Sequence, residues 1–264
     1  MPNAALEDGL ALHYLDRGES RAGAVPILLI PGIPAVAGDW DPLALPLSAS
    51  RRVIAYDNRG SGGSSVTPGP YTTGLLASDA AALLDRLGVG EADVFGMSMG
   101  GMIAQELAIG WPGRVRRLVL GCTHAGIAHA ARPPRESARA FAMQTDDWGE
   151  RMGALAPFAF ASGVEEELLR GFIEKKSGDA QDPEGYRAQI AAVLAHDSAS
   201  RLGEIAAPTL VITGDDDRVI PGASGELLCE RIPGARLATV RGAGHLFFIE
   251  KPAETLALLE EFLA

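Results

Sequence analysis

Short apolar runs alternate with segments of helical periodicity at both ends of this 264-residue chain. The runs are rich in β-branched and aliphatic residues, and turn residues follow most of them closely, as expected of strands. They cover residues 25–30, 52–56, 92–95, 117–120, 208–213 and 236–240. Because these runs are continuously apolar, we expect strands that are buried on both faces.

The segments between the runs place apolar residues at helical spacing. One covers residues 75–87 and is closed by Gly88, and another covers residues 102–109. A last helix is expected to begin at Pro252, a favoured first-turn residue, and to run through Phe262. Strand, helix and strand in repetition predict an α/β fold with a mostly parallel central sheet and helices on both faces.

The alternation stops between residues 123 and 203, where we expect several helices and no strand. Large apolar side chains are concentrated here, among them Trp148, Phe158 and Phe172. We therefore predict a core domain of residues 1–122 and 204–264 with a helical cap insert of residues 123–203. Open α/β sheets bind ligands at the carboxyl ends of their strands, so the cap is expected over that edge.

The formal net charge of −11 argues against nucleic acid as a partner, because phosphate binding depends on clustered lysine and arginine. The longest apolar run, residues 25–33, falls short of the roughly 20 residues that span a bilayer, so no membrane segment is expected. No secretory signal pattern is visible, and we expect a cytoplasmic protein. An acidic surface neither requires nor excludes a dimer, so the oligomeric state is left open.

The two cysteines, Cys122 and Cys229, have neither the CxxC spacing of a metal site nor the density of a disulfide scaffold. We interpret both as small buried residues. His124 and His129 show no HExxH pattern or clustered carboxylates. No metal and no cofactor is therefore expected.

The segment Gly96-Met97-Ser98-Met99-Gly100 follows one predicted strand and precedes a helical segment. This is the context of a nucleophile elbow, in which glycines permit a tight turn that lifts the serine above the sheet. The serine also lies at a helix N-terminus, whose NH groups favour a developing negative charge. We expect Ser98 to be the nucleophile and the NH of Met99 to be an oxyanion donor.

A serine hydroxyl needs a base that removes its proton. His245 lies in a glycine-rich loop directly after the last predicted strand, at the sheet edge expected for Ser98. We therefore expect His245 to be the base. The other histidines are interpreted as structural: His13, His124, His129 and His196.

The base in turn needs a carboxylate that fixes its tautomer. The run Asp215-Asp216-Asp217 follows the predicted strand at residues 208–213 and gives the chain order Ser, Asp, His. The residues alone leave the choice among the three open, since loop aspartates also cap local backbone.

In these motifs the chain resembles the α/β-hydrolase superfamily over nearly its whole length. The acid-loop pattern Gly-x-x-Asp-x-x-x-Pro of that family matches Gly214, Asp217 and Pro221. The resemblance therefore implies that Asp217 is the acid of a catalytic triad, with Asp215 as the alternative.

The resemblance also implies a second oxyanion donor, the NH of Ile33 in Pro31-Gly32-Ile33. Relatives usually carry a histidine where this chain has Pro31, and proline cannot supply that side-chain hydrogen bond. Trp40 and the turn Asp57-Asn58-Arg59-Gly60 also resemble family features, and we interpret both as structural.

An activated serine with an oxyanion hole suits attack on an acyl carbon. Haloalkane dehalogenases and epoxide hydrolases of this fold are disfavoured, because they carry an aspartate at the elbow. Residues 98–106 and 114–120 look most like bacterial lactonases and methylesterases, including 3-oxoadipate enol-lactonase-like proteins. The resemblance implies a serine hydrolase that cleaves a carboxylic ester or lactone of a small, largely apolar molecule through an acyl-enzyme.

Two further classes stay open, since a fold does not fix a function. A carbon-carbon bond (diketone) hydrolase would use the same triad and a similar cap. A non-hydrolytic enzyme or a ligand-binding protein could also be built on this fold.

Overall fold

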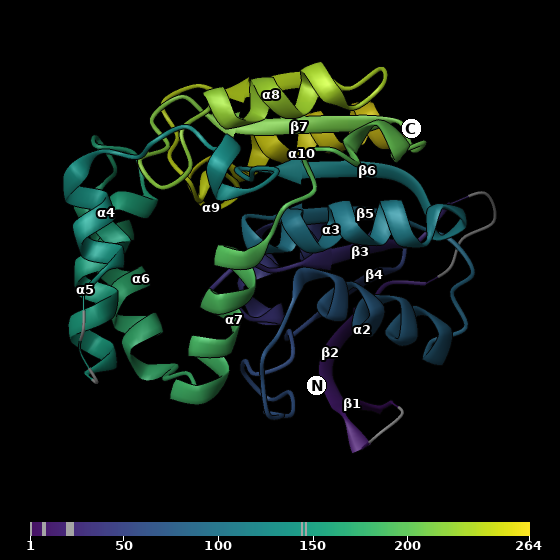
Figure 1. Cartoon of the computed structure of the whole chain (residues 1–264), viewed down its shortest axis with the longest axis horizontal. Helices are drawn as coiled ribbons and strands as arrows, with labels where there is room; N and C mark the ends of the chain where they lie inside the picture. The colour runs from purple at the N-terminus through teal and green to yellow at the C-terminus, as the bar shows by residue number, and fades with distance from the viewer. Residues whose placement is uncertain (1, 7–8, 20–23, 144, 146) are drawn as a thin grey trace.

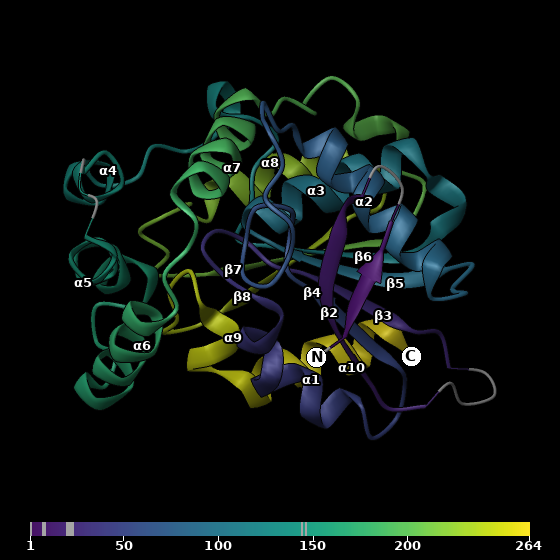
Figure 2. The same cartoon turned by 90° about the horizontal axis from the view of Figure 1, so that it is seen from below.

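The computed structural model describes residues 2–6, 9–19, 24–143, 145 and 147–264. This part of the chain forms an eight-stranded sheet in the order β1-β2-β4-β3-β5-β6-β7-β8 (Figures 1 and 2). The first two pairings, β1 with β2 and β2 with β4, are antiparallel. All the others are parallel. The predicted α/β fold with a mostly parallel sheet is confirmed.

All six predicted runs form strands, and two further strands precede them. The strands are β1 (Asn3–Ala5), β2 (Ala11–Arg17), β3 (Ile27–Ile30), β4 (Val53–Tyr56), β5 (Ala92–Met97), β6 (Val115–Gly121), β7 (Thr209–Gly214) and β8 (Arg236–Val240). The strands β3, β4, β5 and β7 are buried along their whole length, as their continuous apolar pattern predicts. The edge strand β8 is mostly exposed.

Helices cover both faces of the sheet (Figures 1 and 2). They are α1 (Asp41–Leu47), α2 (Thr73–Arg86), α3 (Met99–Gly110), α8 (Ala223–Arg231), α9 (Phe247–Glu250) and α10 (Pro252–Leu263). Side chains of α2, α3 and α8 share one apolar cluster with Leu28 and Ile30 of β3. Side chains of α1, α9 and α10 share a second cluster with Ile27 and Leu29. Alternate residues of one strand therefore enter the two layers of the core.

Among the residues that the structure describes, four α-helices lie between β6 and β7, where helices and no strands are expected. They are α4 (Arg135–Phe141), α5 (Trp148–Ala159), α6 (Glu166–Gly178) and α7 (Pro183–Ala195), and we call residues 135–195 the four-helix segment. The helices α4, α5 and α6 stand together beside the sheet, and α7 leads back to the core (Figures 1 and 2). An isolated β-bridge between Gly126 and Asp197 joins the chain just before the four-helix segment to the chain just after it.

Two smaller predictions have different outcomes. Trp40 is a core residue as expected: its ring stacks on Phe248 with the centroids 4.7 Å apart and meets Phe95 edge-on. Cys122 is buried, but Cys229 is half-buried at the edge of a core cluster, so the prediction of full burial is wrong for Cys229. Within the described ranges, no helix combines the length and the apolar character that crossing a membrane requires.

Candidate active site

Ser98 occupies a strained turn between β5 and α3. Its backbone has φ 56° and ψ −119°, which side-chain-bearing residues rarely adopt. A Cβ atom on Gly96 would lie 2.1 Å from the carbonyl oxygen of Gly100, and one on Gly100 would lie 2.0 Å from that of Ile30. Glycine is therefore required at both positions, and the strand, turn and helix expected around Ser98 are present.

The loop after β3 presses against this turn. A Cβ atom on Gly32 would lie 2.8 Å from Cβ of Ser98, so Ile33 follows directly after a point of contact with the serine. Among the described residues, the NH groups of Ile33 and Met99 have no hydrogen-bond acceptor. The Met99 NH belongs to the first turn of α3, where helices leave their NH groups unpaired.

Pro31 cannot anchor this loop through a side-chain hydrogen bond, and the turn after β4 anchors it instead. The buried Asn58 amide Nδ2 donates to the carbonyl oxygen of Pro31 at 2.9 Å. The neighbouring Asp57 carboxylate accepts a hydrogen bond from the NH of Ala37 at 2.7 Å. The loop that carries Ile33 is therefore held at both ends, and these contacts fit the structural interpretation of the turn at Asp57.

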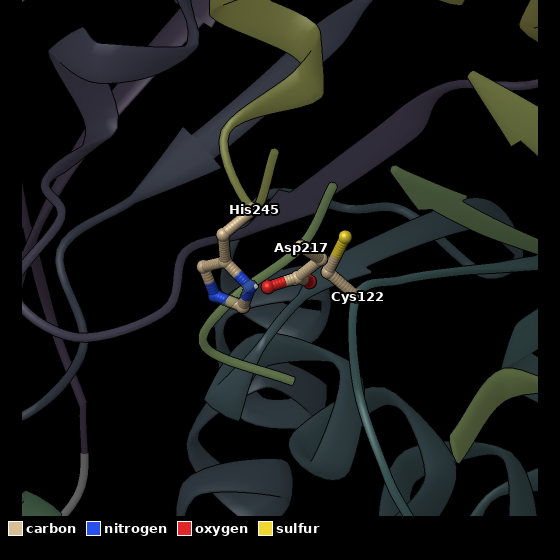
Figure 3. Close-up of side chains that lie close together, drawn as sticks. All are labelled: Cys122, Asp217 and His245. Carbon is tan, nitrogen blue, oxygen red and sulfur yellow. Dashed lines mark hydrogen bonds and ion pairs between the residues drawn. The ribbon is translucent and has the colours of Figure 1, made fainter. Parts of the chain in front are cut away.

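Asp217 and His245 form a buried pair. Oδ2 of Asp217 lies 2.9 Å from Nδ1 of His245 (Figure 3). The other carboxylate oxygen, Oδ1, accepts hydrogen bonds from the NH groups of Val219 and Ile220 at 2.8 and 2.9 Å. Because an ionised carboxylate only accepts hydrogen bonds, the Nδ1 atom of His245 carries the proton. Nε2 is then unprotonated in the neutral ring and can act as a base.

The two neighbouring aspartates face other groups. Asp215 accepts a hydrogen bond from the NH of Gly242 at 2.7 Å. Asp216 accepts from both the NH and the hydroxyl of Ser162, and these hydrogen bonds lower the pKa of its carboxyl below the usual value. Of the three adjacent aspartates, Asp217 is the one placed beside the histidine.

Ser98 and His245 lie at the same edge of the sheet. Ser98 follows the carboxyl end of β5, and His245 follows that of β8. Among the described contacts, none is a hydrogen bond between the Ser98 hydroxyl and His245. Catalytic hydrogen bonds are often long without substrate and tighten in the complex. The structure thus brings Asp217 and His245 together and places Ser98 at the same edge of the sheet.

Cys122 belongs to the same cluster, although the sequence pattern did not identify it. Ligand atoms of Cys122, Asp217 and His245 all lie within 4.8 Å of one another (Figure 3). Burial raises the pKa of the Cys122 thiol well above its usual value, and the adjacent Asp217 raises it further. The thiol is therefore protonated at neutral pH.

The remaining histidines have partners away from this cluster or are held neutral by burial. Nδ1 of His13 lies 2.9 Å from Oδ2 of Asp57. Burial lowers the pKa of His124 and of His196 to about 4. His129 is partly exposed. Within the described residues, none of the four is hydrogen-bonded to Asp217 or His245, although the charge of His245 contributes to the lowered pKa of His124.

A surface hollow of about 420 Å³ lies between the loop after β3 and the end of α6. Val36, Gly38, Lys175 and Gln181 are among its lining residues, whereas Ser98, Asp217 and His245 are not. The hollow is therefore separate from the contact between Asp217 and His245.

Comparison with known proteins identifies the family. Residues 25–252 match the family described as alpha/beta hydrolase fold. The poly(3-hydroxyalkanoate) depolymerase of Ectopseudomonas oleovorans is 34% identical over 90% of this chain and 84% of its own. The 3-oxoadipate enol-lactonase 2 of Acinetobacter baylyi is 35% identical over 76% of this chain and 74% of its own. The crystal structure of the enol-lactonase from Burkholderia xenovorans LB400 superposes with a TM-score of 0.88 at 31% identity, covering 99% of each chain. The chain therefore belongs to the α/β-hydrolase family of enzymes.

Proposed function

We propose that this protein is a serine hydrolase that cleaves a carboxylic ester or a lactone of a small, largely apolar molecule. The observation that carries the proposal is the buried contact between Asp217 and His245. A carboxylate that holds the Nδ1 proton of a histidine leaves Nε2 free to take a proton from a serine hydroxyl. Ser98, at the strained turn on the same sheet edge, is the nucleophile.

The reaction proceeds through an acyl-enzyme. Oγ of Ser98 attacks the acyl carbon while Nε2 of His245 takes the hydroxyl proton. The carbonyl oxygen becomes an oxyanion, which accepts hydrogen bonds from the NH groups of Met99 and Ile33. The tetrahedral intermediate then collapses: the acyl–oxygen bond breaks, and His245 gives its proton to the leaving alkoxide. Water repeats the two steps on the acyl-enzyme and releases the carboxylic acid.

The unpaired NH groups support the assignment of the oxyanion donors. The Met99 NH lies at the N-terminus of α3, where the helix dipole also favours negative charge. The Ile33 NH follows Gly32, which touches Ser98. The two donors thus come from the two segments that meet at the nucleophile.

The insertion of residues 123–203 serves as a cap over this edge in the proposal. Phe160, at the end of α5, has its backbone within contact distance of Gly244, the residue before the proposed base. Its ring meets Phe172 of α6 edge-on, with the centroids 5.0 Å apart. The aromatic side chains of this segment support an apolar substrate in the proposal. The enol-lactonases among the relatives support the ester or lactone class.

Steady-state hydrolysis of a panel of p-nitrophenyl esters and small lactones tests the proposal. Ser98→Ala is compared with wild type and with Ser200→Ala, which replaces an exposed serine. We expect Ser98→Ala to lose turnover while circular dichroism stays unchanged, and Ser200→Ala to match wild type. An active Ser98→Ala protein would contradict the covalent mechanism.

A further inference from the structure

The end of α5 and the turn after it, residues 157–162, lie between the loop of Asp217 and the loop of His245. On the acid side, the Arg218 guanidinium donates to the carbonyl oxygens of Pro157 and Phe160. Asp216 accepts two hydrogen bonds from Ser162 on the same side. The four-helix segment is therefore joined directly to the loop that carries the proposed catalytic acid.

On the base side, a single carboxylate bridges the two segments. Oε1 of Glu250 accepts a hydrogen bond from the NH of Gly244 at 2.7 Å, and Oε2 accepts one from the NH of Ala161 at 3.0 Å. A third link is the hydrogen bond from the NH of Leu246 to the carbonyl oxygen of Ala159 at 2.9 Å. The residues immediately before and after His245 are thus both tied to the end of α5.

The two segments touch closely at this point. A Cβ atom on Gly244 would lie 2.5 Å from the carbonyl carbon of Phe160 and 2.6 Å from the backbone nitrogen of Ala161. The peptide before His245 therefore has no space to move toward α5, and the Glu250 carboxylate restrains it from moving away.

Glu250 ends the short helix α9 and is half-buried. Its charge reaches the cluster at the sheet edge, since it contributes to the raised pKa of the Cys122 thiol. Its two oxygens are nevertheless engaged by backbone NH groups rather than by His245. Glu250 can therefore influence the imidazole through the loop that carries it.

We propose that Glu250 is a positioning residue for His245. Its carboxylate fixes the peptide of Gly244 against Ala161, so that Nε2 of the imidazole is directed toward Ser98. This role rests on the proposed function, in which His245 is the base. Glu250 does not contact the reacting atoms, and it acts by fixing the orientation on which proton transfer depends.

Glu250→Gln tests the bridge with little change in shape. An amide oxygen can accept one of the two hydrogen bonds, while the amide NH₂ would face the other NH group as a second donor. We expect kcat to fall by about tenfold or more, because small displacements of a catalytic group cost one to two orders of magnitude. KM should change by less than about threefold, since the substrate-binding surface is unaltered. Labelling of Ser98 by a fluorophosphonate should slow by the same factor as kcat.

Two further variants separate positioning from charge and from general effects. Glu250→Asp keeps the charge but is one methylene too short to reach both NH groups, so we expect it to lose kcat as the glutamine variant does. Glu260→Gln removes an exposed carboxylate of α10 and should match wild type. A Glu250→Gln or Glu250→Asp protein with wild-type kcat would overturn the proposal.

The bridge can also be tested in the unaltered protein, which covers the case in which a variant fails to fold. Residue-specific hydrogen exchange should show the amides of Gly244 and Ala161 to be as protected as those of the central strands. Rapid exchange of both amides would overturn the proposal. Ser98→Ala and His245→Ala identify the cause of a negative result. If these two variants stay active, the proposed function fails. If they are inactive while Glu250→Gln is fully active, only the positioning role of Glu250 fails.

Discussion

The buried ammonium group of Lys176 in α6 donates a hydrogen bond to the carboxylate of Asp39, in the segment between β3 and α1. Its side chain is 2% exposed and that of Asp39 is 5% exposed. Lys175 contacts the same carboxylate at 3.0 Å from a more exposed position. The contact between Lys176 and Asp39 joins the four-helix segment to the segment between β3 and α1, which also contains the proposed oxyanion donor Ile33.

Lys176→Met is expected to destabilise the protein, because it leaves the Asp39 carboxylate buried with one partner fewer. Removing one member of a buried pair costs about 3 kcal/mol or more. Lys175→Met is the matched control: its side chain is 54% exposed. We expect that change to cost less than about 1 kcal/mol. Urea unfolding of the three proteins measures both values, and equal stabilities would contradict the importance of the buried contact.

The stability contributed by Asp39 should depend on pH. Burial alone would raise the pKa of Asp39, but Lys176, the NH of Val36 and Lys175 together lower it below its usual value. The contribution is therefore complete above the pKa of an unfolded aspartate, about 3.9, and is lost as the pH falls through the lower folded value. The difference in unfolding free energy between wild type and Asp39→Asn should thus be larger at neutral pH than at pH values below that range. A difference that grows on acidification would have the wrong sign.

Asp217→Asn should reduce kcat far more than Asp215→Asn. Loss of the carboxylate beside His245 disturbs the tautomer of the base, an effect of up to about 10⁴-fold in serine hydrolases. Asp215 accepts a hydrogen bond from the Gly242 backbone instead, so we expect its loss to change kcat by less than about threefold. Steady-state kinetics of the two proteins on one ester decide between them, and a larger loss for Asp215→Asn would reverse the assignment.

Cys122 should resist alkylation in the folded protein. Burial and the neighbouring Asp217 raise the pKa of its thiol, and the thiolate is the reactive form. Cys229 is half-buried and serves as the internal comparison. Peptide mass spectrometry after iodoacetamide treatment should show Cys229 modified first and Cys122 modified on unfolding. Fast modification of Cys122 in the native state would place that thiol in a different environment.

The fold could be predicted from the sequence because its signals are local. The strands around Ile30 and Phe95 are buried on both faces and are therefore continuously apolar. By contrast, β1 is three residues long and carries no apolar run, so no pattern indicates it. Ser98 could be identified because its strained turn demands glycine at fixed positions on either side.

Other parts of the site depend on contacts between distant segments. Cys122 meets Asp217 because β6 and β7 are neighbours in the sheet, although 95 residues separate them in sequence. Glu250 likewise binds the NH of Ala161, which lies 89 positions earlier in the sequence, together with that of the nearby Gly244. The family pattern favours Asp217 over its two neighbours, and its contact with His245 gives a geometric reason. Local sequence carries no signal for contacts of this kind.

The measurement that tests the catalytic account most directly is the intact mass of the protein, quenched with acid within the first turnovers of a p-nitrophenyl ester. The acyl-enzyme mechanism predicts a mass increase equal to the acyl group, located on the peptide that contains Ser98 and absent from Ser98→Ala. Rapid turnover by wild type with no acyl group on Ser98 at any quench time, together with an active Ser98→Ala protein, would contradict it.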